Sequence, residues 1–433
     1  MALRNRSRLI SLYTAEAVNS ISCTLLTVGL PFYTSHRFGW GVRENFAVAA
    51  CQGTLYVFGA LSAKRISRRW GREPSLVALC SCMMAFAFAV GICASYSLAF
   101  PTALLVAIET GLMGASWPML ESLVSAAGEQ SQLSRRLGIY NITWASAGAI
   151  ALAASGAIIQ HAPAGAYFGT IAAGHLLAGM LVLRCARSVT ARLEDRVLTQ
   201  PPASAEDEHS GVLEAPLDAD VARRHRLALW LSRIALPSTY VIIFSLSPLL
   251  PSLHAIKQLS PTSATLLASI WLIARAAAFI ITGNTTFWHK RPILMLFASI
   301  TMLFAFLGAV VPGTLTGIGL PQALLFMAIA QIVLGFSIGT IYSASLYFGM
   351  VVSDGSTEHG GYHEALIGLG QILGPIVGTT MQWIHPGALW PAVLGISTVV
   401  AVTVVIEAVA GIRIAGGMGL RTKDKEQALP EIS

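Results

Sequence analysis

Long apolar segments recur along this chain, each of about 20 residues or more, which is the length that a helix needs to cross a lipid bilayer. Lipid offers no hydrogen-bond partners to a backbone, so each segment is expected to form an α-helix, which satisfies its own polar groups. The predicted spans are residues 9–34, 45–63, 74–97, 101–126, 137–160, 164–185, 227–250, 261–284, 292–312, 320–351, 361–384 and 388–411.

The composition agrees with an integral membrane protein. Of the 433 residues, 55% are hydrophobic and 11% are charged, whereas ordinary globular domains carry about 25% charged residues. A membrane β-barrel would need strands of about ten residues with alternating polarity, and the chain has no such pattern. The net charge of +7 does not indicate a nucleic-acid partner, because the cations are divided among separate loops.

The distribution of these cations predicts how the chain is oriented. Five of them fall within "GALSAKRISRRWGREP", between the second and third spans. Both ends of the chain and the long central loop are also rich in cations, and all of these segments fall on one side of the predicted bilayer. Loops rich in Lys and Arg face the cytoplasm. We therefore expect a multi-pass protein of the cell membrane (the inner membrane if it is bacterial) with both termini cytoplasmic.

A polar stretch after the sixth span divides the spans into six and six. It contains prolines and is first acidic and then basic, which is typical of a flexible linker. We predict a six-helix bundle over 1–187, a cytoplasmic linker over 188–226, a second six-helix bundle over 227–412 and a cytoplasmic tail over 413–433. The predicted fold class is an all-α integral membrane protein with twelve transmembrane helices in two pseudo-symmetric halves.

The loop after the second span carries the most specific resemblance to a known family. In "RRWGREP", Arg69, Gly71 and Arg72 fit the pattern that the major facilitator superfamily of secondary transporters carries there. The layout of six plus six spans resembles that family over nearly the whole chain. Two positions depart from the pattern, since Arg68 replaces the usual acidic residue and Glu73 replaces a cation.

The resemblance implies that this loop closes the cytoplasmic contact between the halves, against the start of span eleven. Because the usual acid is absent, we predict that Glu364, at the start of span eleven, pairs with Arg68 or Arg69. An equally good interpretation is a helix-capping glutamate, since a carboxylate in the first turn is favoured by the helix dipole. The predicted gating residues are Arg69, Gly71, Arg72 and Glu364.

Polar residues within the spans are candidate substrate-binding residues, because an ionisable side chain in lipid is costly unless it is paired or hydrated. The resemblance implies that spans one, four, seven and ten line a central cavity. Arg275, in the middle of span eight, needs a carboxylate, backbone carbonyls or an anionic substrate. The predicted cavity residues are Glu16, Asn19, Trp117, Arg233, Tyr240, Arg275, Gln331 and Tyr342.

Span one supplies the candidate for proton coupling. Glu16, Asn19, Cys23 and Thr27 recur at helical spacing and form one polar stripe. Glu16 is the candidate proton carrier, because a carboxyl enclosed by protein can bind and release a proton during transport. It is equally consistent with a solvated residue near the cytoplasmic mouth. Span four also carries Glu109 and Glu121. Weaker candidates are Asn141, Trp144 and Gln371, and we expect His175 and Glu407 to be structural.

Nothing in the sequence indicates an enzyme. The chain lacks a Walker-type phosphate loop, the HExxH zinc motif and a cluster of His and Cys, so no cofactor or metal site is predicted. We expect a secondary active transporter that moves a small organic solute, a metabolite or drug-like compound, by alternating access with proton coupling. Its expected partners are the solute, protons and the bilayer, and a monomer is expected. The alternatives are an uncoupled uniporter and a non-transporting scaffold or sensor on the same fold.

Overall fold

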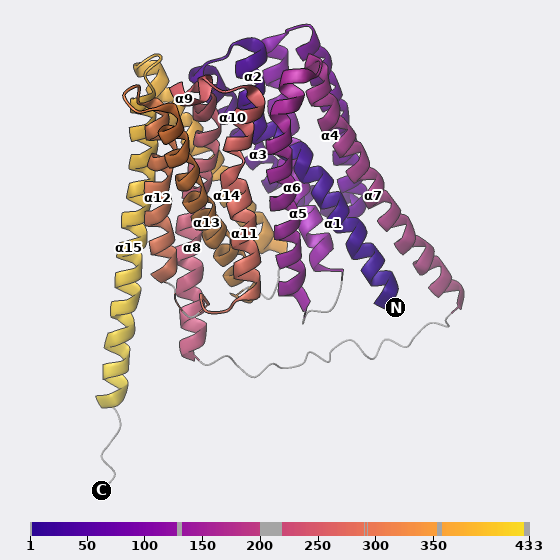
Figure 1. Ribbon diagram of the computed structural model, residues 1–433. Coiled ribbons are helices and arrows are strands. Elements are labelled where there is room, and N and C mark those ends of the chain that lie inside the picture. The colour runs from indigo at the N-terminus through magenta and orange to yellow at the C-terminus, as the bar shows by residue number, and fades with distance from the viewer. Residues whose placement is uncertain are drawn as a thin grey trace.

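Helices make up all of the regular structure in the part of the chain that the computed structural model describes, which is residues 2–127, 132–199, 219–289, 291, 293–352 and 357–427 (Figure 1). The first half of the bundle comprises α1 (Ala2–Thr24), η1 (Leu25–Gly29), α2 (Leu30–Phe38), α3 (Val42–Trp70), α4 (Arg72–Ser95), α5 (Ala99–Ser125), α6 (Leu133–His161) and α7 (Ala164–Thr199). The second half comprises α8 (Ala219–Leu249), η3 (Leu250–Ser252), α9 (His254–Lys257), α10 (Pro261–Ala268), α11 (Ile270–Asn284), α12 (Ile293–Thr314), α13 (Leu320–Val352), α14 (Thr357–Ile384) and α15 (Leu389–Gln427).

Twelve of the helical stretches form the membrane bundle, as the sequence predicts. Eleven stretches of the described chain are long and apolar enough to cross a membrane; one joins α1, η1 and α2, and another joins α10 and α11. The twelfth is α14, which packs along α3 and α8 inside the bundle (Figure 1). Glutamine and glycine residues interrupt the apolar sequence of α14.

The predicted limits of the spans agree closely with these eleven apolar stretches, although some of the helices that contain them, such as α7 and α15, continue further. The largest difference among the eleven stretches is at the second span, which was expected to end at residue 63, whereas α3 continues to Trp70. The added turns carry cations, including Arg68 and Arg69. Hydropathy marks where the chain leaves the lipid, and a helix can continue beyond that point because it satisfies its own backbone.

The two halves meet along two pairs of membrane-spanning stretches. In Figure 1 the first half lies on the right and the second half on the left, and the N-terminal end of α1 and the C-terminal end of α15 lie at the same end of the bundle. Between the halves α3 packs along α14, and α6 packs against α10 and α11. At the opposite end of the bundle, the Thr262 hydroxyl donates to Gln160 Oε1 at 2.8 Å and the Gly156 amide donates to Thr265 Oγ1 at 3.0 Å.

The exact extents of the halves, linker and tail stay predictions. Within the described chain, α7 continues to Thr199 and α8 begins at Ala219, so helix enters both ends of the predicted linker. The central part of that linker lies outside the described residues.

Candidate functional site

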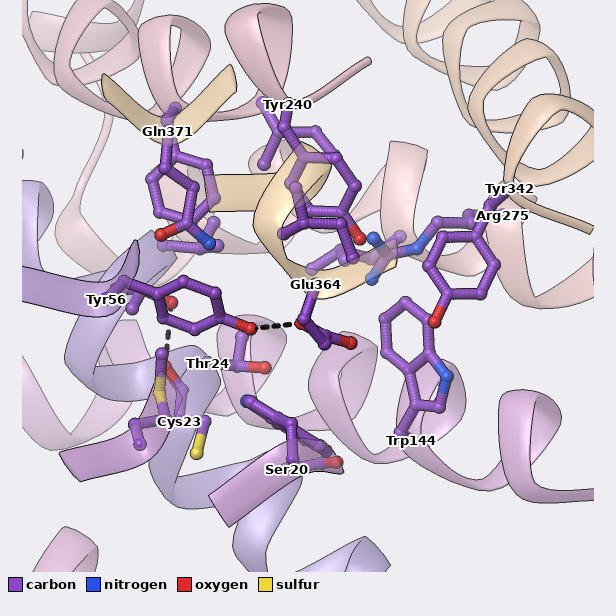
Figure 2. Close-up of a pocket in the computed structure, with 18 of the residues that line it drawn as sticks. Ser20, Cys23, Thr24, Tyr56, Trp144, Tyr240, Arg275, Tyr342, Glu364 and Gln371 are labelled. Atoms are coloured by element: carbon purple, nitrogen blue, oxygen red, sulfur yellow. Dashed lines mark hydrogen bonds between the residues drawn. The ribbon is translucent and has the colours of Figure 1, made fainter. Parts of the chain in front are cut away.

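A cavity of about 110 Å³ lies where the two halves meet. Both halves contribute to its wall: α1, η1, α3, α5 and α6 from the first, and α8, α11, α13 and α14 from the second. The lining combines several aromatic rings with one cation, Arg275, and two carboxyls, those of Glu121 and Glu364. Figure 2 shows Arg275 and Glu364 among the aromatic side chains. This position between the halves is where alternating access would expose a bound solute to one side and then to the other.

Arg275 forms the cationic part of the wall. It lies on α11 with only 6% of its surface exposed. Its guanidinium carbon is 4.3 Å from the ring centroid of Trp144 and 4.9 Å from that of Trp271. Across the described residues, Arg275 makes no hydrogen bond or ion pair, and its Nε is enclosed without a partner. The protein therefore balances this charge with two indole rings and leaves the guanidinium N–H groups without an acceptor.

Glu364 forms a contact between the halves that differs from the predicted one. The Tyr56 hydroxyl on α3 donates to Glu364 Oε2 on α14 at 2.5 Å (Figure 2). Arg68 and Arg69 are exposed on the last turn of α3, and in the described part of the chain neither pairs with Glu364. Tyr56 lies about three turns earlier on the same helix.

The helix-capping interpretation of Glu364 is also wrong. α14 begins at Thr357, about two turns before Glu364, so the carboxyl lies inside the helix rather than in its first turn. The sequence could not show this, because the apolar part of the span begins several residues after the helix does.

The other predicted gating residues lie at the end of the bundle that carries the N-terminal end of α1 and the C-terminal end of α15. Gly71 joins α3 to α4 with a φ of +83° and a ψ of 159°, a backbone conformation that is essentially restricted to glycine. Arg69 and Arg72 are exposed. An ion pair in this region joins Arg8 on α1 to Glu73 on α4, with 3.1 Å between Arg8 Nη2 and Glu73 Oε1.

Four of the eight predicted cavity residues come together in the cavity, and these are Trp117, Tyr240, Arg275 and Tyr342. Glu16 is fully buried and does not line the cavity itself. Its Oε1 accepts a hydrogen bond at 2.9 Å from the hydroxyl of Ser20, and Ser20 does line the cavity. Arg233 and Gln331 do not line it. Gln331 is fully buried on α13, whereas Arg233 is half-buried on α8, about two turns from Tyr240.

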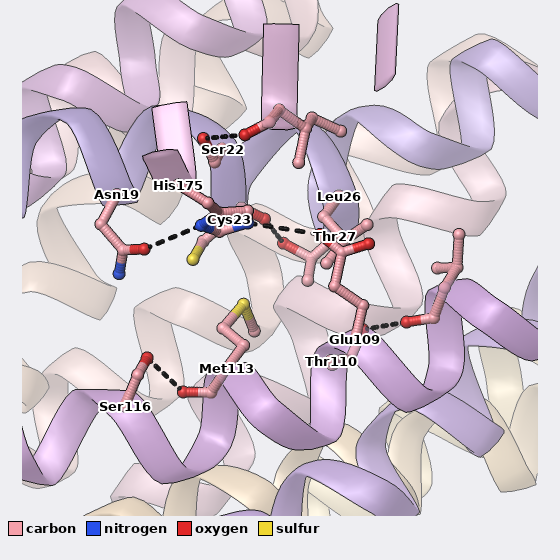
Figure 3. Close-up of polar contacts among 12 residues, drawn as sticks. Asn19, Ser22, Cys23, Leu26, Thr27, Glu109, Thr110, Met113, Ser116 and His175 are labelled. Carbon is pink, nitrogen blue, oxygen red and sulfur yellow. Dashed lines mark hydrogen bonds and ion pairs between the residues drawn. The ribbon is translucent and has the colours of Figure 1, made fainter. Parts of the chain in front are cut away.

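Asn19 belongs to a separate polar cluster inside the first half. Its Oδ1 lies 3.1 Å from His175 Nδ1 on α7, and His175 Nε2 lies 3.3 Å from Glu109 Oε1 on α5 (Figure 3). The side chains of His175 and Glu109 are fully buried. This chain of contacts ties together α1, α5 and α7, so it stabilises the packing of the first half.

The first span changes pitch beside the cavity. Residues Leu25–Gly29 form a π-helical turn (η1), a feature that is frequent at functional sites. Side chains from other helices donate hydrogen bonds to two of its backbone carbonyl oxygens. Tyr167 donates to the Leu25 oxygen at 2.7 Å, and Gln52 donates to the Leu26 oxygen at 3.1 Å. The turn places Thr27, with Cys23 one turn before it, at the cavity wall.

Several lining residues escaped the sequence analysis, chiefly Tyr56, Tyr140 and Trp271. Trp144 and Gln371, which the sequence supports only weakly, also line the cavity. These residues lie on spans two, five, eight and eleven, which the family resemblance does not assign to the cavity. A sequence signal exists only for Trp271, which lies one helical turn before Arg275 on the same face.

Comparisons with known proteins agree on the fold. The family model described as Major Facilitator Superfamily matches residues 12–359. Among solved structures, the nucleoside transporter NupG has a TM-score of 0.61 at 15% identity, covering 94% of this chain and 99% of that one. The peptide transporter POT in complex with alafosfalin has a TM-score of 0.65 at 17% identity, covering 94% of each chain. A search of curated proteins finds no match.

Proposed function

The chain belongs to the major facilitator superfamily, and from this premise we propose that it is a secondary active transporter that moves a small organic solute by alternating access. The observation that carries the proposal is the cavity between the halves. Its aromatic wall with a few charged groups is typical of a site for a small organic molecule. Closing contacts on opposite sides of such a cavity would allow the halves to expose it alternately.

Coupling to protons through Glu16 is part of the proposal. Glu16 is fully buried, its Oε2 has no partner among the described residues, and its Oε1 is linked to the cavity wall through Ser20. A carboxyl in this position can exchange a proton with the cavity through one hydroxyl group, and movement of α1 would change its surroundings. We further propose that both termini lie in the cytoplasm and that the transporter acts as a monomer.

The test is transport in proteoliposomes that contain the purified protein. Counterflow of labelled small acids, amides and amines, measured without an ion gradient, reports exchange through the alternating cavity. We expect counterflow of at least one solute. A protein that binds a solute but never exchanges it would instead be the sensor or scaffold that the sequence leaves as an alternative.

Two matched variants test the proton coupling. Glu16→Gln should keep counterflow but lose the accumulation that an imposed proton gradient drives, because the neutral amide cannot carry a proton. Glu407→Gln is the control, since Glu407 is equally buried but lies on α15, away from the cavity. Gradient-driven accumulation that persists in Glu16→Gln would remove Glu16 from this role, and no accumulation in the unmodified protein would favour a uniporter.

A further inference from the structure

We propose that the transported solute carries one acidic group, a carboxylate or a similar anion, and that Arg275 binds that group in the cavity. This inference rests on the proposed function and names the substrate class of the same site. It starts from Arg275, which lies within the apolar stretch Pro261–Asn284 and makes no ion pair or hydrogen bond with any described residue.

The surroundings of Arg275 stabilise its charge, but the described residues provide no acceptors for its hydrogen-bond donors. A guanidinium has five N–H groups and no acceptor. The rings of Trp144 and Trp271 attract the cation but accept none of these protons in a conventional hydrogen bond. Because buried donors without acceptors are costly, the site favours a ligand that supplies acceptor oxygens. A carboxylate matches the planar guanidinium with two parallel hydrogen bonds.

The side chains around Arg275 also favour an anion from outside the protein. Tyr240 and Tyr342 line the same space and bring phenolic hydroxyl groups, which donate hydrogen bonds readily to a carboxylate (Figure 2). The two cavity carboxyls do not neutralise Arg275 in the described conformation. Glu364 accepts from Tyr56 instead, and Glu121 forms no described ion pair with Arg275.

The rest of the wall limits the solute to one acidic group on a small apolar body. Apolar and aromatic side chains of Trp117, Phe244 and Leu272 face the cavity. The carboxyls of Glu121 and Glu364 line the same cavity, so a second anionic group on the solute would meet like charge when they are ionised. The volume of about 110 Å³ also favours a small monoanion over a larger polyanion.

The test compares solutes that differ only in charge. Benzoate, phenylacetate and indole-3-acetate are each paired with the corresponding amide, and benzylamine represents cations. Binding to the purified full-length protein is measured by thermal-unfolding shift and by quenching of tryptophan fluorescence, since Trp144 and Trp271 flank Arg275. We expect at least one acid to bind about tenfold or more tightly than its amide.

Variants then assign this preference to Arg275. Arg275→Gln should remove the preference for acid over amide, and Arg275→Lys should keep part of it, because Lys retains the charge but not the planar fork. Arg184→Gln is the control: Arg184 is exposed on α7 and does not line the cavity. Should Arg275→Gln fail to fold, the unmodified protein and Arg275→Lys still provide the comparison.

The possible results separate this inference from the proposed function. Binding of no acid, or binding of an amide or benzylamine as tightly as the acids, would overturn the inference. Counterflow of a neutral or cationic solute would overturn it too, while the transporter function would stand. An acid that binds through Arg275 but shows no counterflow would support anion binding by Arg275 and contradict the transporter function.

Discussion

Gly53 lies where α3 packs closely against the backbone of α14 between the two halves, and a single methyl group there should force them apart. A Cβ at Gly53 would be 2.5 Å from the Gln371 carbonyl oxygen, 2.6 Å from its carbonyl carbon and 2.9 Å from the Ile372 nitrogen. All three are backbone atoms of α14, so no side-chain rotation can relieve the overlap. Gly53→Ala must therefore separate the helices by about 1 Å before ordinary contact at about 3.5 Å is restored.

This separation sets the expected magnitude. Overpacking of a close interface costs about 1–3 kcal/mol, which corresponds to a shift of about 5- to 150-fold in a conformational equilibrium. Because Gly53 and Gln371 belong to different halves, the substitution acts on the contact between the halves. We expect it to favour conformations in which the halves are further apart and the cavity is more accessible.

Cys23 provides the assay, since this thiol lines the cavity and is only 4% exposed. In a variant that keeps Cys23 and replaces the other five cysteines, Gly53→Ala should raise the rate of maleimide labelling by about 5- to 150-fold. Gly169→Ala on α7 is the matched control, because a Cβ there meets no atom within 4 Å. Unchanged labelling in Gly53→Ala, with an unchanged Tm, would refute the reasoning.

Three further substitutions test contacts within the described structure. Tyr56→Phe removes the donor to Glu364 and should destabilise the contact between the halves by about 1.5–3 kcal/mol, seen as faster labelling of the cavity thiol. Glu109→Ala leaves buried His175 without the carboxyl that lies 3.3 Å from its Nε2 and should lower the unfolding free energy by about 1–3 kcal/mol, whereas Glu109→Gln should lower it less; equal thermal stability of the two variants would contradict a structural role for this pair. Gly71→Ala must adopt a φ of +83° and should lose about 1–3 kcal/mol, measured as a lower Tm in detergent, with Gly138→Ala, where a Cβ meets nothing within 4 Å, as the control.

The membrane-spanning architecture could be predicted from the sequence alone. Lipid requires each spanning segment to be apolar and to satisfy its own backbone, so length and composition show where the helices cross. The same reasoning located Arg275 in the middle of a span and indicated that it needs a partner or a ligand. The family was also predicted correctly, from the resemblance of the contiguous loop motif that contains Arg69, Gly71 and Arg72.

Only the tertiary structure decided which polar residues share a site. Asn19 and Cys23 lie one turn apart on the first span, yet Cys23 lines the cavity and Asn19 contacts His175. Glu364 contacts Tyr56 rather than Arg69, because α14 begins earlier and packs along the middle of α3.

The physical reason for this division is the uniformity of the lipid. Hydrocarbon chains are as apolar as leucine, so hydropathy separates lipid from water but hardly distinguishes a lipid-facing side of a helix from a protein-facing side. The rotation of each helix and its choice of neighbour depend on close packing at residues such as Gly53 and on a few polar contacts. These are properties of helix pairs in three dimensions, and no single span of the sequence contains them.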